Sequence, residues 1–307
     1  RWGDIVKVTP DGTATLFADL RSIHPDEHWY TIHATAVAPS ISLDTCGTGS
    51  TAGMISYWQG EGNANDYFGL NNGVLQGGAT YASGKVGQAF DFDGSRSSMV
   101  YINHSSSLDA ERSELTLEAW IRIDSVVSVP AVIKKGYKDD SSAQPAQYAI
   151  HLRGNPSVFA PTFDGYNTLN QQFWCEPSAA LGVAVGNWAH LVTTYNSTKQ
   201  SIYLNGQLIK NCTATGYSIR SSTVYLQIGG GIINNQYDGF DGPIDEVAIH
   251  NRSLTPSEIL EHYNAGLVGQ PYCTPPVLPV NFTSPTPEDD SAIYSNNAEI
   301  NASVSTS

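Results

Sequence analysis

Positively charged side chains are scarce in this sequence. Its 307 residues include 15 lysines and arginines against 29 aspartates and glutamates, for a formal net charge of −14 at pH 7. Nucleic acids and anionic membranes are bound through clustered Lys and Arg side chains, so we expect neither as a partner. No apolar run approaches the ~20 residues of a membrane-spanning helix. The acidic balance is compatible with calcium, with neutral glycans or simply with solubility.

Cysteine is also rare, and its spacing argues against one common use. The cysteines form no Cys-x-x-Cys pair and the histidines have no metal-ligand spacing, so we predict no zinc site. Asn-x-Ser/Thr sequons are frequent, at Asn103, Asn196, Asn211, Asn251, Asn281 and Asn301. Paired cysteines and dense sequons together predict a glycoprotein that is extracellular or on the cell surface. No signal sequence precedes Arg1, and we expect the chain to be a mature or excised piece.

A strand followed by one short helix ends the regular pattern. Residues 244–250 alternate as a strand, after a turn rich in Gly and Asp. Thr255 and Glu258 have the spacing of a capping box, which predicts a helix over residues 256–264. Gly266 is expected just beyond the end of that helix, where glycine is favoured. A long β pattern closed by one brief helix is typical of a sandwich.

Several blocks in order resemble the laminin-G-like, concanavalin A-like jelly-roll domains. Besides the closing segment, these blocks are Ile55–Asp66, Gly73–Gly78, Gly84–Gly94, Leu115–Ile121, Val132–Gly136, Gly186–Val192 and Ile202–Gly206. The match covers roughly Gly53 to Gly266. The resemblance implies an all-β fold, an antiparallel two-sheet jelly-roll sandwich with one short C-terminal helix. It implies little about function, because this fold hosts unrelated ligands.

The remaining residues suggest extensions of this domain. Residues 1–50 are expected as an N-terminal β extension, with a hairpin turning at Pro10-Asp-Gly and a strand within residues 31–38. The jelly roll spans residues 51–268, and residues 269–286 form a proline-rich linker. Residues 287–307 are expected as a C-terminal strand or the start of an immunoglobulin-like module.

The four cysteines allow three pairings by sequence alone. Within the resembled fold, we expect Cys175 to pair with Cys212 inside the jelly roll. The first and last strands of such a sandwich are neighbours, which implies that Cys46 and Cys273 join the two flanks. Trp58, Trp120 and Trp188 lie in alternating apolar patterns and are expected to be structural.

No catalytic constellation is visible. Concanavalin A-like glycoside hydrolases place two carboxylates on one strand, commonly as Glu-x-Asp-x-x-Glu, about 5–5.5 Å apart in retaining enzymes. Asp109, Glu111 and Glu114 come nearest, but they precede a strand. Asp245 and Glu246 are adjacent, which places them on opposite faces of a regular strand. We therefore predict that the protein is not an enzyme.

Calcium is the better chemical hypothesis. This cation prefers six to eight oxygen ligands from carboxylates, amides and turn carbonyls. In many relatives of the resembled family a calcium ion lies where the first loop meets the last strand. That implies a structural site formed by Glu61, Asp66, Asp93 and Asp245. The alternative is that these side chains only accept hydrogen bonds from turn amides.

A carbohydrate site would need exposed aromatic rings beside polar side chains. Residues 166–184 look like an insertion relative to the family, and functional loops on rigid scaffolds often have this composition. The candidate ligand-binding residues are Tyr67, Phe68, Tyr166, Asn170, Gln171, Phe173 and Trp174. The alternative is that Phe173 and Trp174 bury the insertion against the sandwich around Cys175.

Two functions from different classes follow. The first is a non-catalytic extracellular recognition module that binds a glycan or a surface protein. The second is a structural subunit of an extracellular filament or surface layer, which self-associates through its terminal strands. Residues 298–304 read as a strand without partners in this sequence, and such a strand can complete a neighbour's sheet. Head-to-tail donation would produce an open polymer. We rank binding first.

Overall fold

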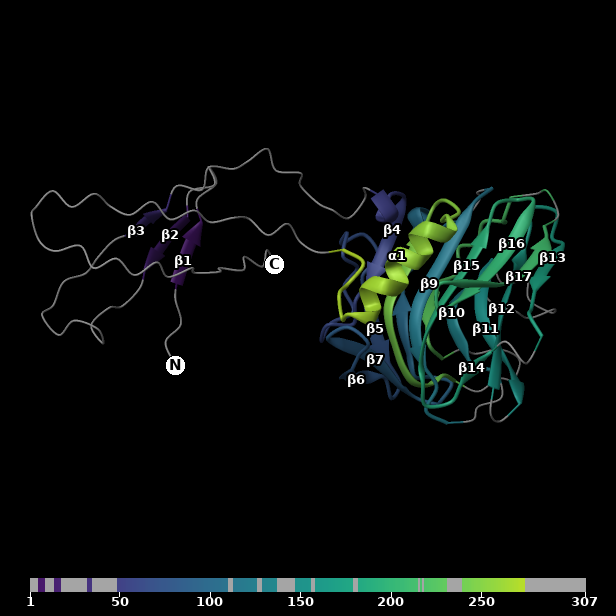
Figure 1. Ribbon diagram of the computed structural model, residues 1–307, viewed down its shortest axis with the longest axis horizontal. Helices are drawn as coiled ribbons and strands as arrows, with labels where there is room; N and C mark the ends of the chain where they lie inside the picture. Colours follow the sequence, from purple (N-terminus) through teal and green to yellow (C-terminus); the bar gives the residue numbers. More distant parts are fainter. Residues whose placement is uncertain are drawn as a thin grey trace, which may run out of the picture. The chain divides into compact units, whose positions relative to one another are not determined.

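The computed structural model describes most of the central part of the chain. The described residues are 5–8, 14–17, 32–34, 49–109, 113–125, 129–136, 147–155, 158–178, 182–214, 216, 218–230 and 239–273. The chain divides into two units, residues 46–274 and a second unit that combines residues 1–45 with residues 275–307. Figure 1 shows the elements of each unit.

The smaller unit contains three short strands. β1 (Ile5–Val8) pairs antiparallel with β2 (Ala14–Phe17), and β2 pairs antiparallel with β3 (Ile32–Ala34). The hairpin and the third strand lie where the sequence predicts them. The predicted strand at residues 298–304 lies outside the described residues, as does Cys46.

The larger unit is a sandwich of two antiparallel sheets, as the sequence predicts. One sheet, called the β11 sheet, has the order β13-β12-β11-β10-β18-β8-β5, with β14 beside β12. Its strands are β5 (Gly73–Gln76), β8 (Met99–Ile102), β10 (Ala131–Lys135), β11 (Tyr148–Asn155), β12 (Val158–Tyr166), β13 (Gln172–Cys175), β14 (Val183–Ala184) and β18 (Leu226–Ile228). A 3₁₀ turn, Ser106–Leu108, follows β8.

The other sheet, the helix-side sheet, has the order β17-β16-β15-β9-β19-β7-β6, with β4 beside β19. Its strands are β4 (Met54–Trp58), β6 (Thr80–Ser83), β7 (Gln88–Asp93), β9 (Leu115–Arg122), β15 (Trp188–Tyr195), β16 (Lys199–Leu204), β17 (Gln207–Thr213) and β19 (Asp241–His250). A 3₁₀ turn, Gly49–Thr51, precedes β4. Alternate residues of both sheets point inward and form one shared core. Phe90, Leu117, Ile150 and Phe163 in that core are all 0% exposed.

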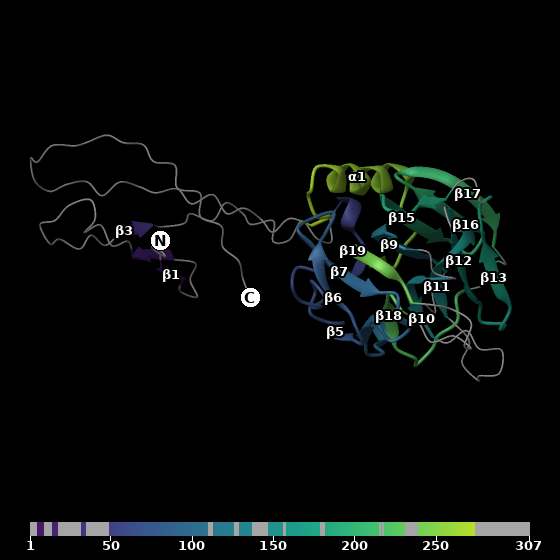
Figure 2. The ribbon, with the colours of Figure 1, turned by 90° about the horizontal axis from the view of Figure 1, so that it is seen from below.

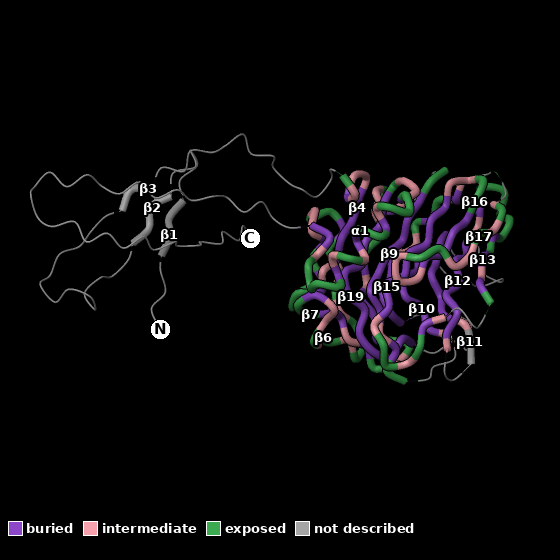
Figure 3. Tube along the Cα trace, in the orientation of Figure 1, coloured by how far each residue is buried: buried purple, intermediate pink, exposed green. Residues whose placement is uncertain are grey.

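One helix, α1 (Pro256–Leu267), covers the outer face of the helix-side sheet, as Figures 1 and 2 show. Its N-terminus has the predicted capping box between Thr255 and Glu258. Under and beside it lies a second apolar cluster, formed by Met54, Tyr57, Trp120, Ala248, Tyr272 and Cys273. Both faces of this sheet are therefore covered, and Figure 3 shows its central strands buried. Within the described chain, no helix has the length and apolarity needed to cross a membrane.

The helix ends later than the sequence predicts. It runs through Gly266 to Leu267, so Gly266 is a helical residue and not the residue after the helix. The reason is close packing, because a Cβ atom at Gly266 would lie 2.4 Å from Nε1 of Trp120. Glycine is required here by the approach of the helix to the indole. Trp58 and Trp120 are buried as predicted, whereas Trp188 is only half-buried.

A β-bulge in β19 overturns one prediction from strand alternation. The pairing of β19 with β9 shifts register between Asp245 and Ala248, and Glu246 has a φ of 51°. Such a bulge inserts an extra residue and interrupts the alternation of faces. Asp245 pairs with Trp120 of the second cluster, while Glu246 accepts hydrogen bonds from Tyr57 and Tyr272 of the same cluster. Both acids therefore lie on the helix-covered side, not on opposite faces.

Candidate functional site

The predicted calcium ligands accept hydrogen bonds from backbone amides. The Asp66 carboxylate accepts from the amides of Tyr57, Phe68, Leu70 and Asn71, at 2.9 to 3.4 Å. These four donors fix the loop that follows β4. They surround the carboxylate with N–H groups, which is the arrangement that the turn-amide alternative predicts.

The other three predicted ligands lie in similar surroundings. Asp245 accepts from the amides of Lys85, Val86 and Glu246 at 2.7 to 2.9 Å. Glu61 accepts from the amide of Gln88 at 3.1 Å, and Asp93 accepts from the amide of Ser95 at 2.9 Å. In the part of the chain that the structure describes, these four acids do not form a group of converging metal ligands. The calcium site stays a prediction.

The aromatic candidates separate into buried and exposed groups. Phe173 is 2% exposed and packs edge-on against Phe163 in the sandwich core. Trp174, the next residue of β13, is 47% exposed. Tyr67 and Phe68 pack against the second cluster near β4 and α1, whereas β13 lies at the opposite end of the sandwich (Figure 1). The seven predicted residues therefore do not form one platform.

The turn between β12 and β13 holds two polar candidates. Asn170 has a φ of 59°, and its side-chain oxygen accepts a hydrogen bond from Arg220 at 2.8 Å. The side-chain oxygen of Gln171 accepts a hydrogen bond from the side-chain nitrogen Nδ2 of Asn167 at 3.1 Å. Tyr166 ends β12 and is half-buried. Asn170 and Gln171 are both exposed at the edge where β13 carries Trp174.

A row of mostly polar, largely buried side chains crosses the outer side of the β11 sheet. Strand register aligns Trp174 with Asp164, Asp164 with Ala149, and Ala149 with Lys134. The row continues through Gln227 and Tyr101 on the next two strands. These residues alternate with core residues such as Ile150 and Phe163, so their side chains point away from the core.

Adjacent positions of the same outer side carry further polar groups. His151 pairs with Thr162 in register, and its Nδ1 lies 3.4 Å from a carboxylate oxygen of Asp164. The Arg153 guanidinium lies 4.5 Å from the centre of the Trp174 ring. Cationic and aromatic groups thus lie side by side on this face, and a stacked guanidinium fixes the orientation of the indole.

Several buried polar atoms on this outer face have no hydrogen-bond partner among the described residues. They are Gln147 Oε1 and Nε2, His151 Nε2, Arg153 Nε and Thr162 Oγ1. Gln147, His151 and Thr162 are no more than 3% exposed. Buried polar atoms in native proteins are nearly always hydrogen-bonded, to protein, water or ligand. The outer face of β11 and β12 therefore has unused hydrogen-bonding capacity. We refer to these atoms and Trp174 as the polar face.

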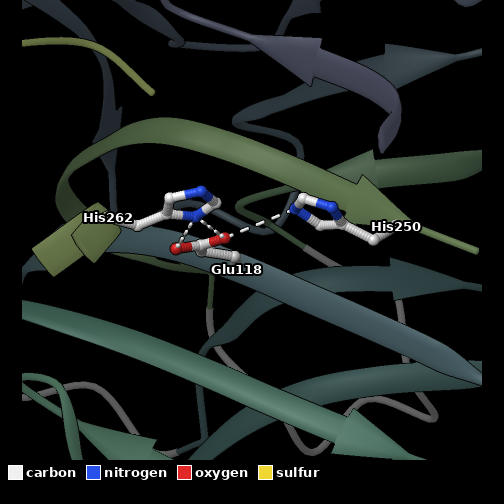
Figure 4. A group of neighbouring side chains, drawn as sticks. All are labelled: Glu118, His250 and His262. Carbon is white, nitrogen blue, oxygen red and sulfur yellow. Dashed lines mark hydrogen bonds and ion pairs between the residues drawn. The ribbon is translucent and has the colours of Figure 1, made fainter. Parts of the chain in front are cut away.

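A second polar assembly lies under α1, on the helix-side sheet. Glu118 of β9, His190 of β15, His250 of β19 and His262 of α1 converge there, and each is no more than 1% exposed. His262 Nδ1 lies 3.0 Å from both carboxylate oxygens of Glu118, and His190 Nε2 lies 2.8 Å from Oε1. Figure 4 shows the Glu118 carboxylate held between the rings of His250 and His262.

The electrostatics of this assembly favour a charged carboxylate. Burial opposes the charged form of Glu118, but His262 and hydrogen bonds from the histidines hold the pKa of that carboxyl well below its usual value. Burial also acts against protonation of His262, yet the facing Glu118 raises the pKa of that imidazole. Burial lowers the pKa of His250. The assembly is therefore a buried carboxylate whose charge is stabilised by the imidazoles around it.

Two adjacent acids lie beside this assembly. Burial, and then the neighbouring Asp245, raise the pKa of the Glu246 carboxyl well above its usual value. Burial also raises the pKa of Asp245, to about 7. Glu246 accepts hydrogen bonds from the Tyr57 hydroxyl and from the Tyr272 amide. Both residues are 0% exposed.

Sequence reasoning did not identify the histidine assembly. Its members are far apart in sequence, so no local spacing marks them. One signal was present: Glu118 and His190 are polar residues inside strands that also carry core residues, and polar residues at such positions require partners when both faces are covered. Their partners become visible only when the sheet order is known.

The structure confirms one of the two predicted disulfides. Cys175 and Cys212 form a disulfide with a Cα–Cα distance of 5.7 Å. Cys273 is also disulfide-bonded, but its predicted partner Cys46 lies outside the described residues. Among the sequons, Asn103, Asn211 and Asn251 are exposed and Asn196 is half-buried, while Asn281 and Asn301 lie beyond the described residues. Glycosylation stays a prediction.

A family profile matches more than half of the chain. Residues 93–260 match the profile described as the concanavalin A-like lectin/glucanases superfamily. A search of curated protein sequences returns no match. The matched region contains both the polar face and the histidine assembly, apart from His262.

Solved structures with the same fold include binding domains of toxins and one domain of an arabinanase. The binding domain of Paraclostridial Mosquitocidal Protein 1 is 14% identical with a TM-score of 0.57, over 71% of this chain and 53% of that chain. Domain 4 of AbnA, an extracellular arabinanase from Geobacillus stearothermophilus solved with arabinotriose, is 16% identical with a TM-score of 0.51, over 68% and 97%.

The ligand-binding domain of botulinum neurotoxin serotype D was solved with N-acetylneuraminic acid. It is 15% identical with a TM-score of 0.52, over 69% of this chain and 51% of that chain. The chain thus spans about half the length of these toxin domains. At these sequence identities, the similarity shows a shared fold and nothing further.

Proposed function

Because the chain belongs to the concanavalin A-like lectin/glucanases superfamily, we propose that it is a non-catalytic, extracellular carbohydrate-binding module whose site is the polar face. The partner is a glycan, free or carried by a surface protein. This proposal concerns the jelly roll, residues 51–268, and not any larger protein.

The unused hydrogen-bonding capacity of the polar face carries this proposal. A sugar offers many hydroxyl groups, each of which both donates and accepts a hydrogen bond. Gln147 supplies an acceptor and donors, Thr162 a hydroxyl and His151 a ring nitrogen, all without partners in the described chain. The half-exposed Trp174 ring supplies an apolar plate for the C–H face of a sugar. Sites for small ligands combine such an aromatic surface with a few convergent polar groups.

The similar structures support a binding role of this chemical class. Domain 4 of the arabinanase was solved with arabinotriose, and the chain covers 97% of that domain. The neurotoxin domain was solved with an acidic sugar. The Cys175–Cys212 disulfide is consistent with an oxidising, extracellular location.

The test is a binding experiment with two probes, arabinotriose and N-acetylneuraminic acid, after a glycan array has ranked further sugars. Titration calorimetry would compare the native chain with Trp174→Ala and Thr162→Val. We expect Trp174→Ala to weaken binding on the order of tenfold, because ring stacking contributes about 0.5–1.5 kcal/mol or somewhat more. Repeating the titrations with and without calcium tests the predicted structural ion.

Thr162→Val distinguishes a loss of sugar binding from a loss of folding stability. Its hydroxyl is buried without a partner among the described residues, so removing it should leave folding stability unchanged or raise it by about 1 kcal/mol. The same change should weaken sugar binding several-fold. Thr193→Val is the matched control, because the Thr193 hydroxyl is equally buried and unpartnered in the described part but lies in the other sheet. Binding that survives both polar-face substitutions would overturn the proposed site.

The filament alternative stays a second proposal, motivated by the terminal segments. Light scattering and negative-stain microscopy of the full chain, before and after deletion of residues 287–307, test it. Large assemblies that disappear on deletion would support strand donation, whereas an unaffected monomer would remove the idea.

A further inference from the structure

We propose that Glu118, His250 and His262 form a buried, structural binding site for a divalent transition-metal ion of the zinc class. The proposal concerns the helix-covered side of the helix-side sheet. It is independent of the carbohydrate site, which lies on the other sheet.

The geometry of the three side chains suits such an ion. One potential ligand atom from each residue lies within 4.8 Å of the others. His262 Nδ1 is 3.0 Å and His250 Nε2 is 3.5 Å from the same oxygen, Glu118 Oε2. Zinc holds nitrogen and oxygen ligands at about 2.0–2.2 Å, so tetrahedral ligand atoms lie roughly 3.4 Å apart. Only small side-chain rotations separate the observed arrangement from a coordinated one.

The Nδ1 atom of His250 is an independent observation. His250 is 0% exposed, its Nδ1 has no hydrogen-bond partner among the described residues, and its Nε2 has only the 3.5 Å contact with Glu118 Oε2. Figure 4 shows a ring nitrogen of His250 directed toward the Glu118 carboxylate, which His262 also contacts. A buried imidazole held by only one long contact is unfavourable, and coordination of Nε2 to a metal ion would replace that contact with a stronger one.

The surroundings provide the outer contacts that metal ligands usually have. His190 Nε2 lies 2.8 Å from Glu118 Oε1 and 3.2 Å from the Tyr272 hydroxyl. A hydrogen bond to Oε1 orients the carboxylate and directs Oε2 toward the other two histidines, as outer partners of metal ligands do.

The donor set selects the kind of ion. Two imidazoles with one carboxylate suit zinc and related transition metals, whereas calcium and magnesium prefer oxygen ligands. The ligands come from β9, β19 and α1, so the ion would connect the helix to the sheet. Because every ligand is buried, the ion would be incorporated during folding and would not meet a substrate. Such a site is not recognisable in the sequence, because the three ligands do not form a short motif with a characteristic spacing.

The experiment measures metal in the full chain, purified without a polyhistidine tag. We expect about one zinc ion per chain by plasma mass spectrometry. Refolding in Co²⁺ should give the visible absorption bands of tetrahedral cobalt, and refolding in Zn²⁺ should raise the melting temperature above that of chelator-treated protein. The refolding arms use the native sequence, so they do not depend on any variant folding.

Two variants and a control assign the ligands. His250→Gln and Glu118→Gln should each reduce bound metal to below about a tenth of an ion per chain. His104→Gln is the control, because His104 is exposed and lies outside the assembly, and it should retain the full metal content. A native chain that contains no metal and gives no cobalt spectrum after refolding would overturn the proposal. The assembly would then be a hydrogen-bonded network of carboxylate and imidazoles only.

Discussion

At the scale of single residues, the acidic side chains that the sequence singles out accept hydrogen bonds from backbone amides. Asp66 and Asp245, the predicted oxygen ligands of calcium, each accept several N–H groups that fix loops, and their role as metal ligands stays a prediction. Residue type alone could not decide between these roles, because the same oxygens suit a cation and an amide. The decisive fact is which backbone segment the fold brings beside each carboxylate.

The buried Asp245 carboxyl makes folding stability depend on pH. Burial raises its pKa to about 7, although the amides of Lys85 and Val86 act in the opposite direction. An unfolded Asp has a pKa of about 3.9, so between pH 4 and 7 the folded chain binds the extra proton. Stability should therefore decrease as the pH rises through this window, by at most about 1.4 kcal/mol per pH unit. Glu246 contributes with the same sign, because its pKa is also raised.

Urea unfolding at pH 5 and pH 7.5 checks this prediction. Asp245→Asn should reduce the loss of stability between the two values, even if the variant is less stable at both. The groups facing Asp245 are Glu246, Glu61 and the amides of the Lys85 loop, and they stay unchanged in this variant. Asp93→Asn is the control, since hydrogen bonds with Ser95 lower the pKa of the exposed Asp93 carboxyl. Identical pH dependence in Asp245→Asn and the native chain would contradict the assignment.

At the scale of elements, the sequence predicted those features that neighbouring residues determine. The capping box at Thr255 starts α1 where expected, because cap and helix lie within one turn. The end of α1 was predicted wrongly, since Gly266 is selected by the approach of Trp120 from a distant strand. The bulge at Glu246 was missed for a similar reason. Alternation assumes a regular strand, and nothing in the local sequence marks where β19 departs from it.

Substitution of Gly266 tests the contact between helix and sheet. In Gly266→Ala, the added methyl would meet the Trp120 indole at about the 2.4 Å given by the geometry of its Cβ. We expect a net destabilisation of about 1–2 kcal/mol, because overpacking of about 1–3 kcal/mol exceeds the gain of up to about 1 kcal/mol in helix propensity. Thermal or urea unfolding measures it. Asn264→Ala, at an exposed position of the same helix, should be neutral or slightly stabilising.

At the scale of the whole molecule, the order of family-like blocks was sufficient to predict the two-sheet sandwich. It was not sufficient to predict the candidate site. Phe173 and Trp174 are neighbours in sequence, yet one points into the core and the other away from it, because β13 pairs with β12 in one particular register. The polar face likewise depends on Gln147, His151 and Thr162 being placed on adjacent strands. Those pairings are long-range properties that composition does not contain.

The Cys175–Cys212 disulfide connects the two sheets at the end that carries Trp174. Cys175 ends β13, the outermost strand of the β11 sheet, and Cys212 lies in β17, the outermost strand of the helix-side sheet. The bond closes a segment with a sequence separation of 37. The loop-closure entropy of a segment of this length corresponds to a stabilisation of about 4 kcal/mol. Measured stabilisation by disulfides is often smaller, typically about 2–4 kcal/mol.

Replacing both cysteines by serine should therefore lower the free energy of unfolding by about 2–4 kcal/mol. Because β13 would lose its tether to β17, the orientation of Trp174 should become less fixed, and sugar binding should weaken beyond the loss caused by reduced folding alone. Urea unfolding and calorimetric titration at a temperature where the variant remains folded measure the two effects separately. Unchanged affinity in a folded variant would show that pairing with β12 alone positions Trp174, and that the disulfide acts only on stability.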